Sequence, residues 1–493
     1  MACTHAVHPS PISRNTTGRT MTTHTASGRP PRREPHAPEL ERRLQPRHIR
    51  FIALGSAIGT GLFYGSAETI QTAGPAVLLA YLAAGCVVFI VMRALGEMAV
   101  RHPVAGSFAR YADRYLSPRV AFLTGWTFVF EMIVVAIADM TAVGHYMGMW
   151  FPDTPGWLWM LAAMLLVGGL NLLRVSVFGE LEFWFSLIKV VTIIAMIVGG
   201  LYLIVFGISI GGYEPGVHNL VDHGGFAPFG VWGIIMSLGI VVFSFGGIET
   251  LGMTAGEADA PAKAIPKAVN SVPVRVLIFY VLSIGVMLCL FPWDRIGSEG
   301  SPFVQVFAGL GLPAAEHLIN AVVLTAALSA MNSIFYAAAR TMFGLAEQGH
   351  APASFTHVSR FGVPSWPVSV IAACLLAGLG LYFWIPDQLF LVVASIATFA
   401  TVLTWTVILL SHHRMRRSMR ASGERTAFPL PWWPVPTYIA LAFMGAVVVI
   451  LGFSASGRTA LVVGAVWLVL LLIAYRLWVP AAGHERIELE TRR

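Results

Sequence analysis

Charged residues are scarce in this sequence of 493 residues. Lys, Arg, Asp and Glu make up 12% of it, which is about half of their share in an average soluble domain. A soluble chain of this length would fold into several domains with polar surfaces, and such surfaces need more charge than is present. The hydrophobic share of 56% and the mean hydropathy of +0.71 agree with this reading. The composition therefore predicts one membrane-embedded domain.

Cysteine is rare as well, with four residues at Cys3, Cys86, Cys289 and Cys374. Their spacing fits neither a metal site nor the paired framework of a secreted protein. The first 46 residues contain no long apolar run, which argues against a signal peptide, and we expect a disordered cytoplasmic tail there. The sequence shows no nucleophile elbow, phosphate loop or zinc spacing, so it predicts neither an enzyme nor a metal site.

Long uncharged stretches, by contrast, recur along the whole chain. About 20 apolar residues are enough for a helix to cross the hydrocarbon core of a bilayer. By this criterion the sequence predicts an all-α integral membrane protein with twelve transmembrane helices. The apolar stretches that define these spans are Phe51–Ala67, Thr69–Met92, Phe122–Trp150, Thr154–Leu173, Val190–Tyr213, Gly224–Ile248, Val276–Trp293, Leu318–Ala339, Trp366–Ile385, Gln388–Ser411, Pro429–Gly457 and Thr459–Tyr475.

Lys and Arg are distributed unevenly between the two sides of these spans. Loops and tails on the side of the N-terminus hold 28 of the 32, and the opposite side holds only Arg295 and Arg458. Cytoplasmic loops retain positive charge, so we expect a multi-pass protein of the plasma (inner) membrane with both termini in the cytoplasm. This topology accounts for the net charge of +7, and no basic patch with interleaved aromatic residues indicates a nucleic-acid partner.

Glycine is dense in the first span, at Gly55, Gly59, Gly61 and Gly65. Four glycines in eleven residues favour local unwinding, which leaves backbone N–H groups free to bind a carboxylate. The alternative is close helix packing through small residues four positions apart, as in Gly55 with Gly59 and Gly61 with Gly65. Both interpretations fit this stretch taken alone.

A second break is predicted in the sixth span, where Gly246 and Gly247 are followed by Glu249. An isolated carboxylate near the middle of the membrane costs several kcal/mol, so packing alone does not explain it. Glycine-broken segments in corresponding places of two halves indicate an inverted repeat with a binding site between them. Spans one to five and six to ten would form those halves, and the two breaks together favour a binding site.

Lys189 lies inside the fifth span, at a depth of about 10 Å for a rise of 1.5 Å per residue. A buried lysine can exchange its proton and serve as a coupling group. Two other roles fit equally well. The side chain could extend to the cytoplasmic interface, or it could pair with Glu182, one heptad earlier on the same face.

Four further charged residues interrupt apolar spans. Glu131 and Asp139, eight residues apart in the third span, are placed by this spacing toward the bundle interior. They fit a proton relay, a substrate contact or a hydrogen-bonded structural role, and a functional role is favoured for Asp139. Arg93 and Glu97, one turn apart in the second span, fit a helix-end ion pair or a cytoplasmic gate.

Several stretches resemble the amino-acid permeases of the amino acid–polyamine–organocation superfamily, within its bacterial amino acid transporter family. The resemblance extends from about Leu40 to Trp478. The stretches that carry it are RHIRFIALGSAIGTGLF (47–63), MRALGEM (92–98), GELEFWF with IKV (179–185 and 188–190), TAGEA (254–258) and IPKAVNS (265–271).

This resemblance implies a LeuT-like fold, in which two inverted repeats of five helices are followed by two C-terminal helices. It also implies transport by alternating access rather than catalysis. The expected organisation is a disordered cytoplasmic N-terminal tail (1–46), a transport core (47–410) with repeats at 47–213 and 224–410, a basic cytoplasmic loop (411–432), helices 11 and 12 (433–479) and a cytoplasmic C-terminal tail (480–493).

The resemblance also implies residue roles. The substrate carboxylate would meet the backbone of the first break, the ammonium would meet carbonyls of the second, and an aromatic ring would form a lid. Glu249 is similar to a sixth-helix glutamate implicated in proton linkage, and Lys189 to a fifth-helix lysine that occupies the cation site of sodium-coupled relatives, so H+ is the expected coupling ion and no other cofactor is expected. The expected substrate-binding residues are Ile58, Gly59, Thr60, Gly61, Phe243 (the lid), Ser244, Phe245 and Gly246; the expected proton-coupling residues are Glu249, Lys189 and Asp139; gating or structural roles are expected for Arg93, Glu97 and Glu131.

Within the family, residues 63–67 and 131–142 look closest to the branch of proline and histidine permeases. The expected function is therefore proton-coupled import of proline or histidine. One alternative is a permease for threonine, serine or another neutral amino acid, and a second is an amino acid sensor that keeps the fold without transport. The expected partners are the amino acid substrate and the lipid bilayer, and no obligate protein partner is expected.

Overall fold

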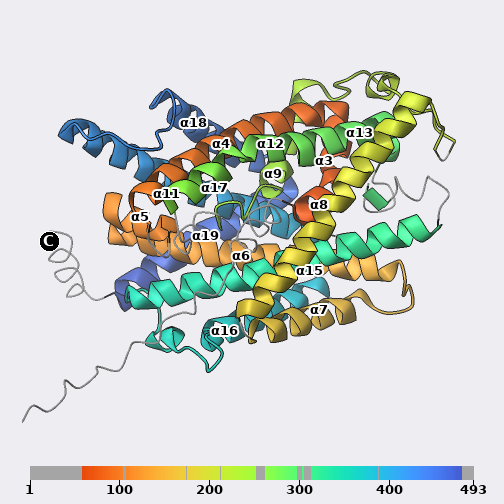
Figure 1. Ribbon diagram of the computed structural model, residues 1–493. Helices are drawn as coiled ribbons and strands as arrows, with labels where there is room; N and C mark the ends of the chain where they lie inside the picture. The colour runs from red at the N-terminus through yellow and green to blue at the C-terminus, as the bar shows by residue number, and fades with distance from the viewer. Residues whose placement is uncertain are drawn as a thin grey trace, which may run out of the picture. The chain divides into compact units, whose positions relative to one another are not determined.

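The computed structural model of the protein describes residues 58–103, 107–173, 175–210, 212–250, 261–296, 303–304, 313–386 and 388–479. These residues form helices joined by loops (Figure 1). Four predicted features lie outside the described residues: the tails at 1–46 and 480–493, Gly55 of the first break, and the stretch 254–258.

Eight spans in the described part of the chain are long and apolar enough to cross a membrane, judged by length and composition. Three shorter apolar helices accompany them: α7 (Gly156–Asn171), α9 (Gly230–Phe243) and α18 (Val435–Leu451). The long spans consist of α3 (Gly65–Ala73) with η1 (Gly74–Ala76) and α4 (Val77–Arg101), α6 (Pro118–Gly148), α8 (Val175–Phe206), the run of α11 (Pro261–Asn270), α12 (Val272–Val276), η3 (Leu277–Leu282) and α13 (Ser283–Leu290), α15 (Pro313–Glu347), α16 (Ser365–Tyr382), α17 (Leu389–Ser422) and α19 (Ala455–Trp478). The short helices α2 (Thr60–Phe63) and α5 (Ser107–Tyr115) precede α3 and α6.

The first two predicted spans are divided at Gly74 rather than at Glu68. Helix α3 continues to Ala73, and Gly74 then turns the chain with φ of +61°, a conformation that glycine adopts without strain. A Cβ atom at Gly74 would lie 2.5 Å from Cγ of Pro228. The predicted boundary between the two spans was placed at Glu68 because of its charge. The chain turns instead at Gly74, where glycine permits both the positive φ and the close approach of Pro228.

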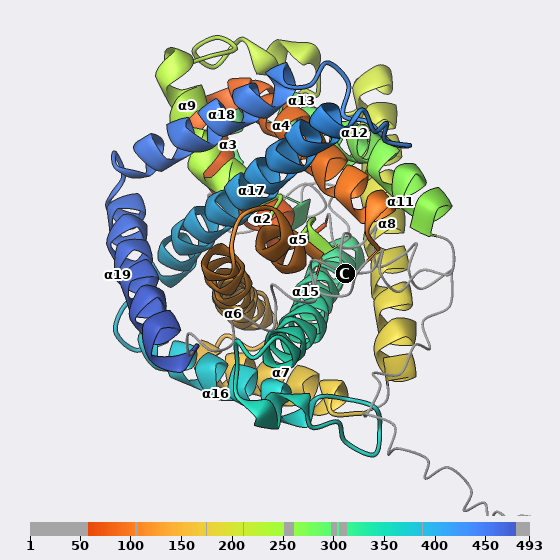
Figure 2. The ribbon, with the colours of Figure 1, turned by 90° about the vertical axis from the view of Figure 1, so that its left-hand side faces the viewer.

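Helix α6 lies at the centre of the described helices and packs against α15 and α17 (Figure 2). Its N-terminus is capped by Ser117, whose Oγ accepts a hydrogen bond from the N–H of Val120 at 3.3 Å. Apolar residues occur on all of its sides, which is typical of a helix buried all round. Phe128, Ala136 and Met140 have no exposed surface. Side chains on α6 are therefore held by neighbours from several directions.

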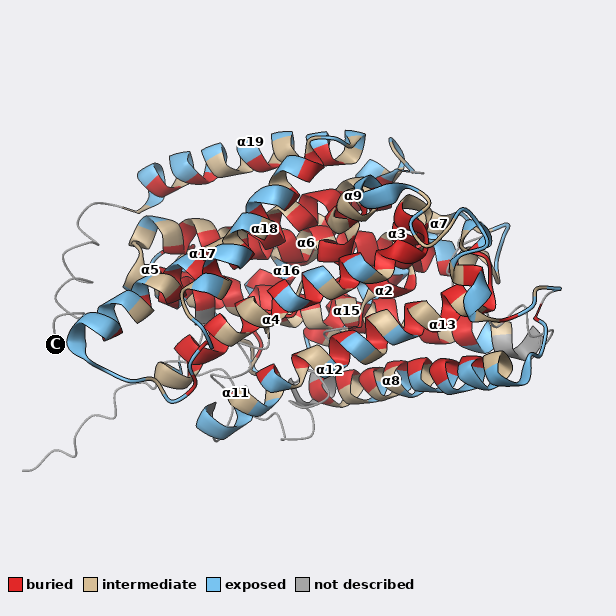
Figure 3. Cartoon of the chain, turned by 90° about the horizontal axis from the view of Figure 1, so that it is seen from above, coloured by how far each residue is buried: buried red, intermediate tan, exposed pale blue. Residues whose placement is uncertain are grey.

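Helices α8 and α19 have the opposite character, because much of each span is exposed (Figure 3). Val205 on α8 is 75% exposed and Val462 on α19 is 63% exposed. Exposing an apolar surface of this extent to water is unfavourable. Exposing it to lipid tails costs no free energy, because the tails are themselves apolar. These two helices therefore belong to the lipid-facing side of the molecule.

Helix α17 continues through residues 411–422, where the sequence predicted the first part of a basic loop. Met415 and Met419, four positions apart, are buried, whereas Arg420 is exposed. This spacing is that of an amphipathic helix. Burial of the apolar side therefore keeps these residues helical, although their charges had predicted a loop. The helix ends at Gly423, which has φ of +71° and forms a left-handed C-cap.

We predict that Gly378→Ala on α16 lowers the stability of the fold. An added Cβ atom would lie 2.5 Å from Cδ1 and 2.6 Å from Cγ1 of Ile137 on α6, and such overpacking costs about 1–3 kcal/mol. Gly380→Ala is the matched control, because nothing lies within 4 Å of its Cβ position. Thermal unfolding of the purified protein in detergent should give a lower melting temperature for Gly378→Ala alone. Equal melting temperatures for the two variants would contradict this packing.

Candidate functional site

The chain leaves helical geometry at two points that contact each other. At the first break, Gly59 has extended dihedral angles (φ −124°, ψ −169°) immediately before α2. At the second, turns follow the end of α9, and Gly247 has φ of +86°. The hydroxyl of Ser244 in the second break donates a hydrogen bond to the carbonyl of Gly61 in α2 at 2.9 Å. The two breaks therefore form one continuous region of irregular backbone.

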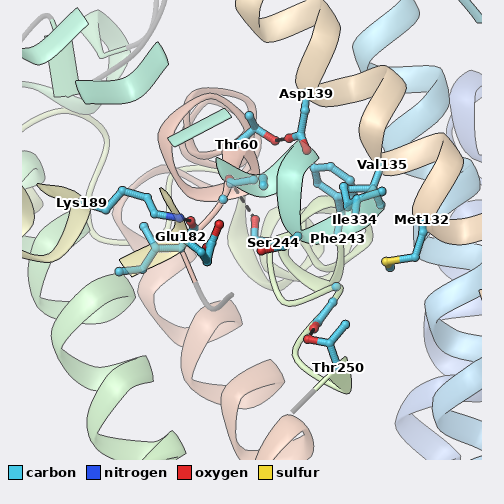
Figure 4. Close-up of a pocket in the computed structure, with 17 residues that line it drawn as sticks. Thr60, Met132, Val135, Asp139, Glu182, Lys189, Phe243, Ser244, Thr250 and Ile334 are labelled. Carbon is cyan, nitrogen blue, oxygen red and sulfur yellow. Dashed lines mark hydrogen bonds between the residues drawn. The ribbon is translucent and has the colours of Figure 1, made fainter. Parts of the chain in front are cut away.

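A cavity lies between the two breaks and helices α6, α8 and α15 (Figure 4). Figure 4 shows Lys189 beside Glu182 on one side of it, and Met132, Val135 and Ile334 on the other. One wall therefore carries charged groups, and the other is apolar except for Asp139 on the same helix as Met132 and Val135. The lining residues are Ile58, Gly59, Thr60, Gly61, Met132, Val135, Asp139, Glu182, Lys189, Phe243, Ser244, Gly246, Gly247, Thr250, Ala330, Ser333 and Ile334.

The structure brings most of the predicted substrate-binding residues to this cavity, and Phe245 is the exception. The Phe245 side chain is buried and packs against Tyr280 and Tyr81, with ring centroids 4.6 Å and 6.1 Å apart. Successive residues of a turn face different directions, so Phe243 lines the cavity while Phe245 anchors the break to its neighbours. Phe245 therefore supports the break from behind.

Several lining residues were not found by sequence reasoning. Met132 and Val135 come from α6, and Ala330 and Ile334 come from α15. They are apolar residues within apolar spans, so nothing distinguishes them in the sequence from residues that face lipid. The spacing of Met132 and Val135 relative to Asp139 was the available signal, because it places them on the same side of one helix.

Asp139 joins α6 to the first break. The Thr60 hydroxyl donates a hydrogen bond of 2.6 Å to Oδ1 of Asp139. The second oxygen, Oδ2, is buried and has no hydrogen-bond partner among the described residues. A buried carboxylate oxygen is costly when no donor reaches it. A cation or a hydrogen-bond donor within the cavity would satisfy it.

Lys189 is 1% exposed and joins three elements at the opposite wall. Its Nζ donates a hydrogen bond to the carbonyl of Ile58 at 3.2 Å and to Oγ of Ser329 on α15 at 3.0 Å. Oγ of Ser329 in turn donates to Oε1 of Glu182 at 2.8 Å. Of the two structural alternatives raised by the sequence, the contacts favour the association with Glu182, and it runs through a serine hydroxyl.

A pair of buried carboxyl groups lies next to the second break. Glu131 on α6 accepts hydrogen bonds from the hydroxyls of Thr401 at 2.6 Å and Thr404 at 3.3 Å, and Glu249 accepts one from Nε1 of Trp405 at 3.1 Å. The two carboxyl groups are close enough to interact electrostatically. Two adjacent negative charges repel strongly, so one proton held by this pair would relieve the repulsion.

Arg93 and Glu97, predicted as an ion pair or a gate, have separate partners in the described part of the chain. Glu97 has no exposed surface and contacts Nε2 of His412 at 2.9 Å and Nη1 of Arg416 at 3.1 Å, both on α17. Arg93 donates to Oδ1 of Asn270 at 2.7 Å. These contacts fasten the C-terminal end of α4 to α17 and α11, away from the cavity.

Known proteins match this chain over nearly its whole length. The model of a family described as amino acid permease matches residues 48–482. An uncharacterized amino acid permease, YtnA of Bacillus subtilis (strain 168), is 47% identical over 438 residues, 89% of this chain and 95% of the relative. The amino-acid permease AapA of the same organism is 42% identical over 447 residues, 91% and 96% of the two chains. The aromatic amino acid transport protein AroP of Escherichia coli (strain K12) is 43% identical over 440 residues, 89% and 96% of the two chains.

These comparisons support the amino acid permease family and not the finer prediction of the proline and histidine branch, because none of the three relatives is named as a proline or histidine permease. The prediction was based on residues 63–67 and 131–142. Phe63 packs against Phe303 with ring centroids 4.8 Å apart, and Asp139 is bound to Thr60. These two contacts join the first break to residues elsewhere in the chain.

We predict that Gly61→Ala disrupts the site while Gly59→Ala leaves the fold intact. A Cβ atom at Gly61 would lie 2.6 Å from Cα of Ser244, and backbone cannot move aside as a flexible side chain can. Nothing lies within 4 Å of the Cβ position at Gly59. Gly61→Ala should lower the melting temperature in detergent, with overpacking of about 1–3 kcal/mol. A melting temperature equal to that of Gly59→Ala would contradict direct contact between the breaks.

Proposed function

The chain belongs to the amino acid permease family, and we propose that it is a proton-coupled importer of neutral amino acids with aromatic or large apolar side chains. Family membership makes it a transporter rather than an enzyme, a multi-pass membrane protein whose substrate class is an amino acid. The observation that carries the finer proposal is the cavity at the two helix breaks, with its polar wall and its apolar wall.

The two breaks would hold the charged ends of the amino acid. The first N–H groups of a helix have no acceptor within it and carry partial positive charge, so the backbone at Gly59–Gly61 suits a carboxylate. Carbonyl groups at the end of α9 suit an ammonium, as does the unpartnered Oδ2 of Asp139. The ring of Phe243 lines the cavity and packs edge-on against Phe390, with centroids 5.8 Å apart. These two rings would close over the bound substrate.

The apolar wall would receive the substrate side chain. Met132, Val135 and Ile334 offer apolar surface, and Met adapts its shape to flat or irregular groups. A charged side chain placed there would lose its hydration without gaining a partner, because Oδ2 of Asp139 would already bind the substrate ammonium. The name of AroP, an aromatic amino acid transport protein, agrees with this assignment for a relative that is 43% identical.

Proton coupling would use the buried ionisable groups on both sides of the cavity. The Glu131–Glu249 pair lies next to the second break, so the gain or loss of its shared proton changes the charge beside Gly246. Lys189, which binds the carbonyl of Ile58, places an ammonium near the first break. A resident positive charge there disfavours Na+, which supports H+ as the coupling ion.

The remaining parts of the topology belong to the same proposal. The family implies a LeuT-like fold, and we assign twelve spans, two inverted repeats of five helices, and both termini on the cytoplasmic side of the plasma membrane. The contact between the first and sixth spans through Gly61 and Ser244 supports this arrangement, as does the distribution of Lys and Arg. Alternating access would then expose the cavity to each side in turn.

The transport assay that tests this function uses purified protein in proteoliposomes with an imposed pH gradient, acidic outside. We expect labelled phenylalanine, tyrosine, tryptophan and leucine to accumulate, and lysine and glutamate to be excluded, because the apolar wall offers a charged side chain no partner. Proline and histidine serve as comparators, because they are the substrates that the sequence predicted. Accumulation that ignores the gradient would refute the coupling, and preferred uptake of a charged amino acid would refute the side-chain assignment.

We further predict that Glu249→Gln uncouples transport from the gradient. An amide of the same shape cannot release a proton, so gradient-driven accumulation should fall by about tenfold, within the range typical of coupling between two sites. Glu68→Gln is the matched control, because Glu68 is an exposed carboxyl group on α3. Uptake by both variants is measured with and without the gradient. A wild-type response in Glu249→Gln would mean that this carboxyl group is structural.

A further inference from the structure

We propose that Glu182 is the proton-exchange partner of Lys189, with the hydroxyl of Ser329 as the relay between them. Neither Glu182 nor Ser329 was among the residues expected to take part in coupling. This inference rests on the proposed function, because it specifies how one of the coupling groups would exchange its proton. It makes Glu182 a positioning residue for Lys189 and a temporary proton acceptor.

The hydrogen bonds between the three groups have a consistent direction. Nζ of Lys189 can only donate as an ammonium, and its bond to Oγ of Ser329 is 3.0 Å. That hydroxyl keeps one proton to donate, and it donates to Oε1 of Glu182 at 2.8 Å. An ammonium, a hydroxyl and a carboxylate are thus connected in the order that a proton relay requires. Both distances lie within the normal range for hydrogen bonds.

Glu182 is held in place as a carboxylate by donors from two helices. It is 1% exposed, and besides Ser329 it accepts from Oγ of Ser186 at 3.4 Å and from Nδ2 of Asn332 at 3.5 Å. Oδ1 of Asn332 accepts from Asn171 on α7 at 2.9 Å. These contacts fix the position of the Glu182 carboxyl group between α8 and α15. The polar chain therefore runs from the cavity into the packed region between α8, α15 and α7.

The proton step is balanced. An N–H bond of the Lys189 ammonium breaks as that proton bonds to Oγ of Ser329, while the O–H bond of Ser329 breaks as its proton bonds to Oε1 of Glu182. The products are a neutral amine, a restored hydroxyl and a carboxylic acid. No proton enters or leaves the trio, and no group is oxidised or reduced. Two opposite buried charges are removed together, which avoids leaving either one unpaired in the membrane.

The consequence for the cavity follows from the other contact of Lys189. An ammonium donates a stronger hydrogen bond to the carbonyl of Ile58 than a neutral amine does. Transfer of the proton to Glu182 therefore weakens the hold of α8 on the first break. The charged groups that act on Lys189 are Glu182 on its own helix and Asp139 on α6. A bound substrate ammonium would change the charge around Asp139. Lys189 thereby links substrate binding at Asp139 to the location of the proton.

The experiment measures protons taken up per substrate molecule in proteoliposomes that contain a pH-sensitive dye and receive labelled substrate. We expect the ratio to fall by about tenfold in Glu182→Gln and in Ser329→Ala, which is roughly the factor that one hydrogen bond to a charged group is worth. Ser395→Ala on α17 is the matched control, since this buried serine donates to the carbonyl of Leu391 in its own helix at 2.8 Å. Its ratio should equal that of the wild type.

Conservative variants separate a relay from a structural role. Ser329→Thr keeps the hydroxyl and Glu182→Asp keeps the carboxylate, so both should recover part of the ratio that the first variants lose. Unchanged ratios in Glu182→Gln and Ser329→Ala would overturn the inference. An equal loss in Ser329→Thr and Ser329→Ala would also overturn it, because the hydroxyl would then have no role and Ser329 would matter only for packing. A wild-type ratio of zero would instead refute the proposed proton coupling, and it is measured first.

Discussion

Backbone groups that leave helical geometry inside a membrane need partners from the protein, because hydrocarbon supplies none. In this molecule three freed carbonyls are paired with side chains from other elements. Lys189 binds the carbonyl of Ile58, Ser244 binds that of Gly61, and the hydroxyl of Tyr280 binds that of Ser244 at 2.7 Å. The two breaks can persist only while α8, α9 and η3 remain near them. The cavity is thus a consequence of how these elements satisfy one another.

Two buried carboxyl groups follow the same rule, since each is stabilised by a residue from a different helix. Glu131 on α6 depends on Thr401 of α17, and Glu97 on α4 depends on His412 of α17. A buried charge that loses its partner costs several kcal/mol. A change of protonation at such a group therefore alters the energy of a helix-helix contact, and proton binding and helix movement can be coupled without any additional device.

The apolar part of the cavity contributes to selectivity for the substrate side chain. Met132 and Ile334 come from α6 and α15, two helices that pack closely along their length. Their contribution to selectivity is a surface that suits an apolar group, and one methylene more or less in such a surface changes affinity only modestly. Members of the amino acid permease family can differ in this surface. Residues 63–67 and 131–142 therefore did not identify the substrate, and the proline and histidine branch that they predicted is not supported by the relatives.

The sequence alone determined the membrane class, the two glycine breaks and the ionisable groups Lys189, Asp139 and Glu249 within apolar spans. Each of these is a local departure from an apolar span, and its cost is visible wherever the helix packs. The sequence did not determine which residues these charged groups contact. Arg93 and Glu97 are one turn apart, yet they hydrogen-bond to different residues, whereas Glu131 and Glu249 come from distant spans and meet. An all-apolar helix has no side that its sequence marks as inward, so the packing of its neighbours alone selects the residues that face the cavity.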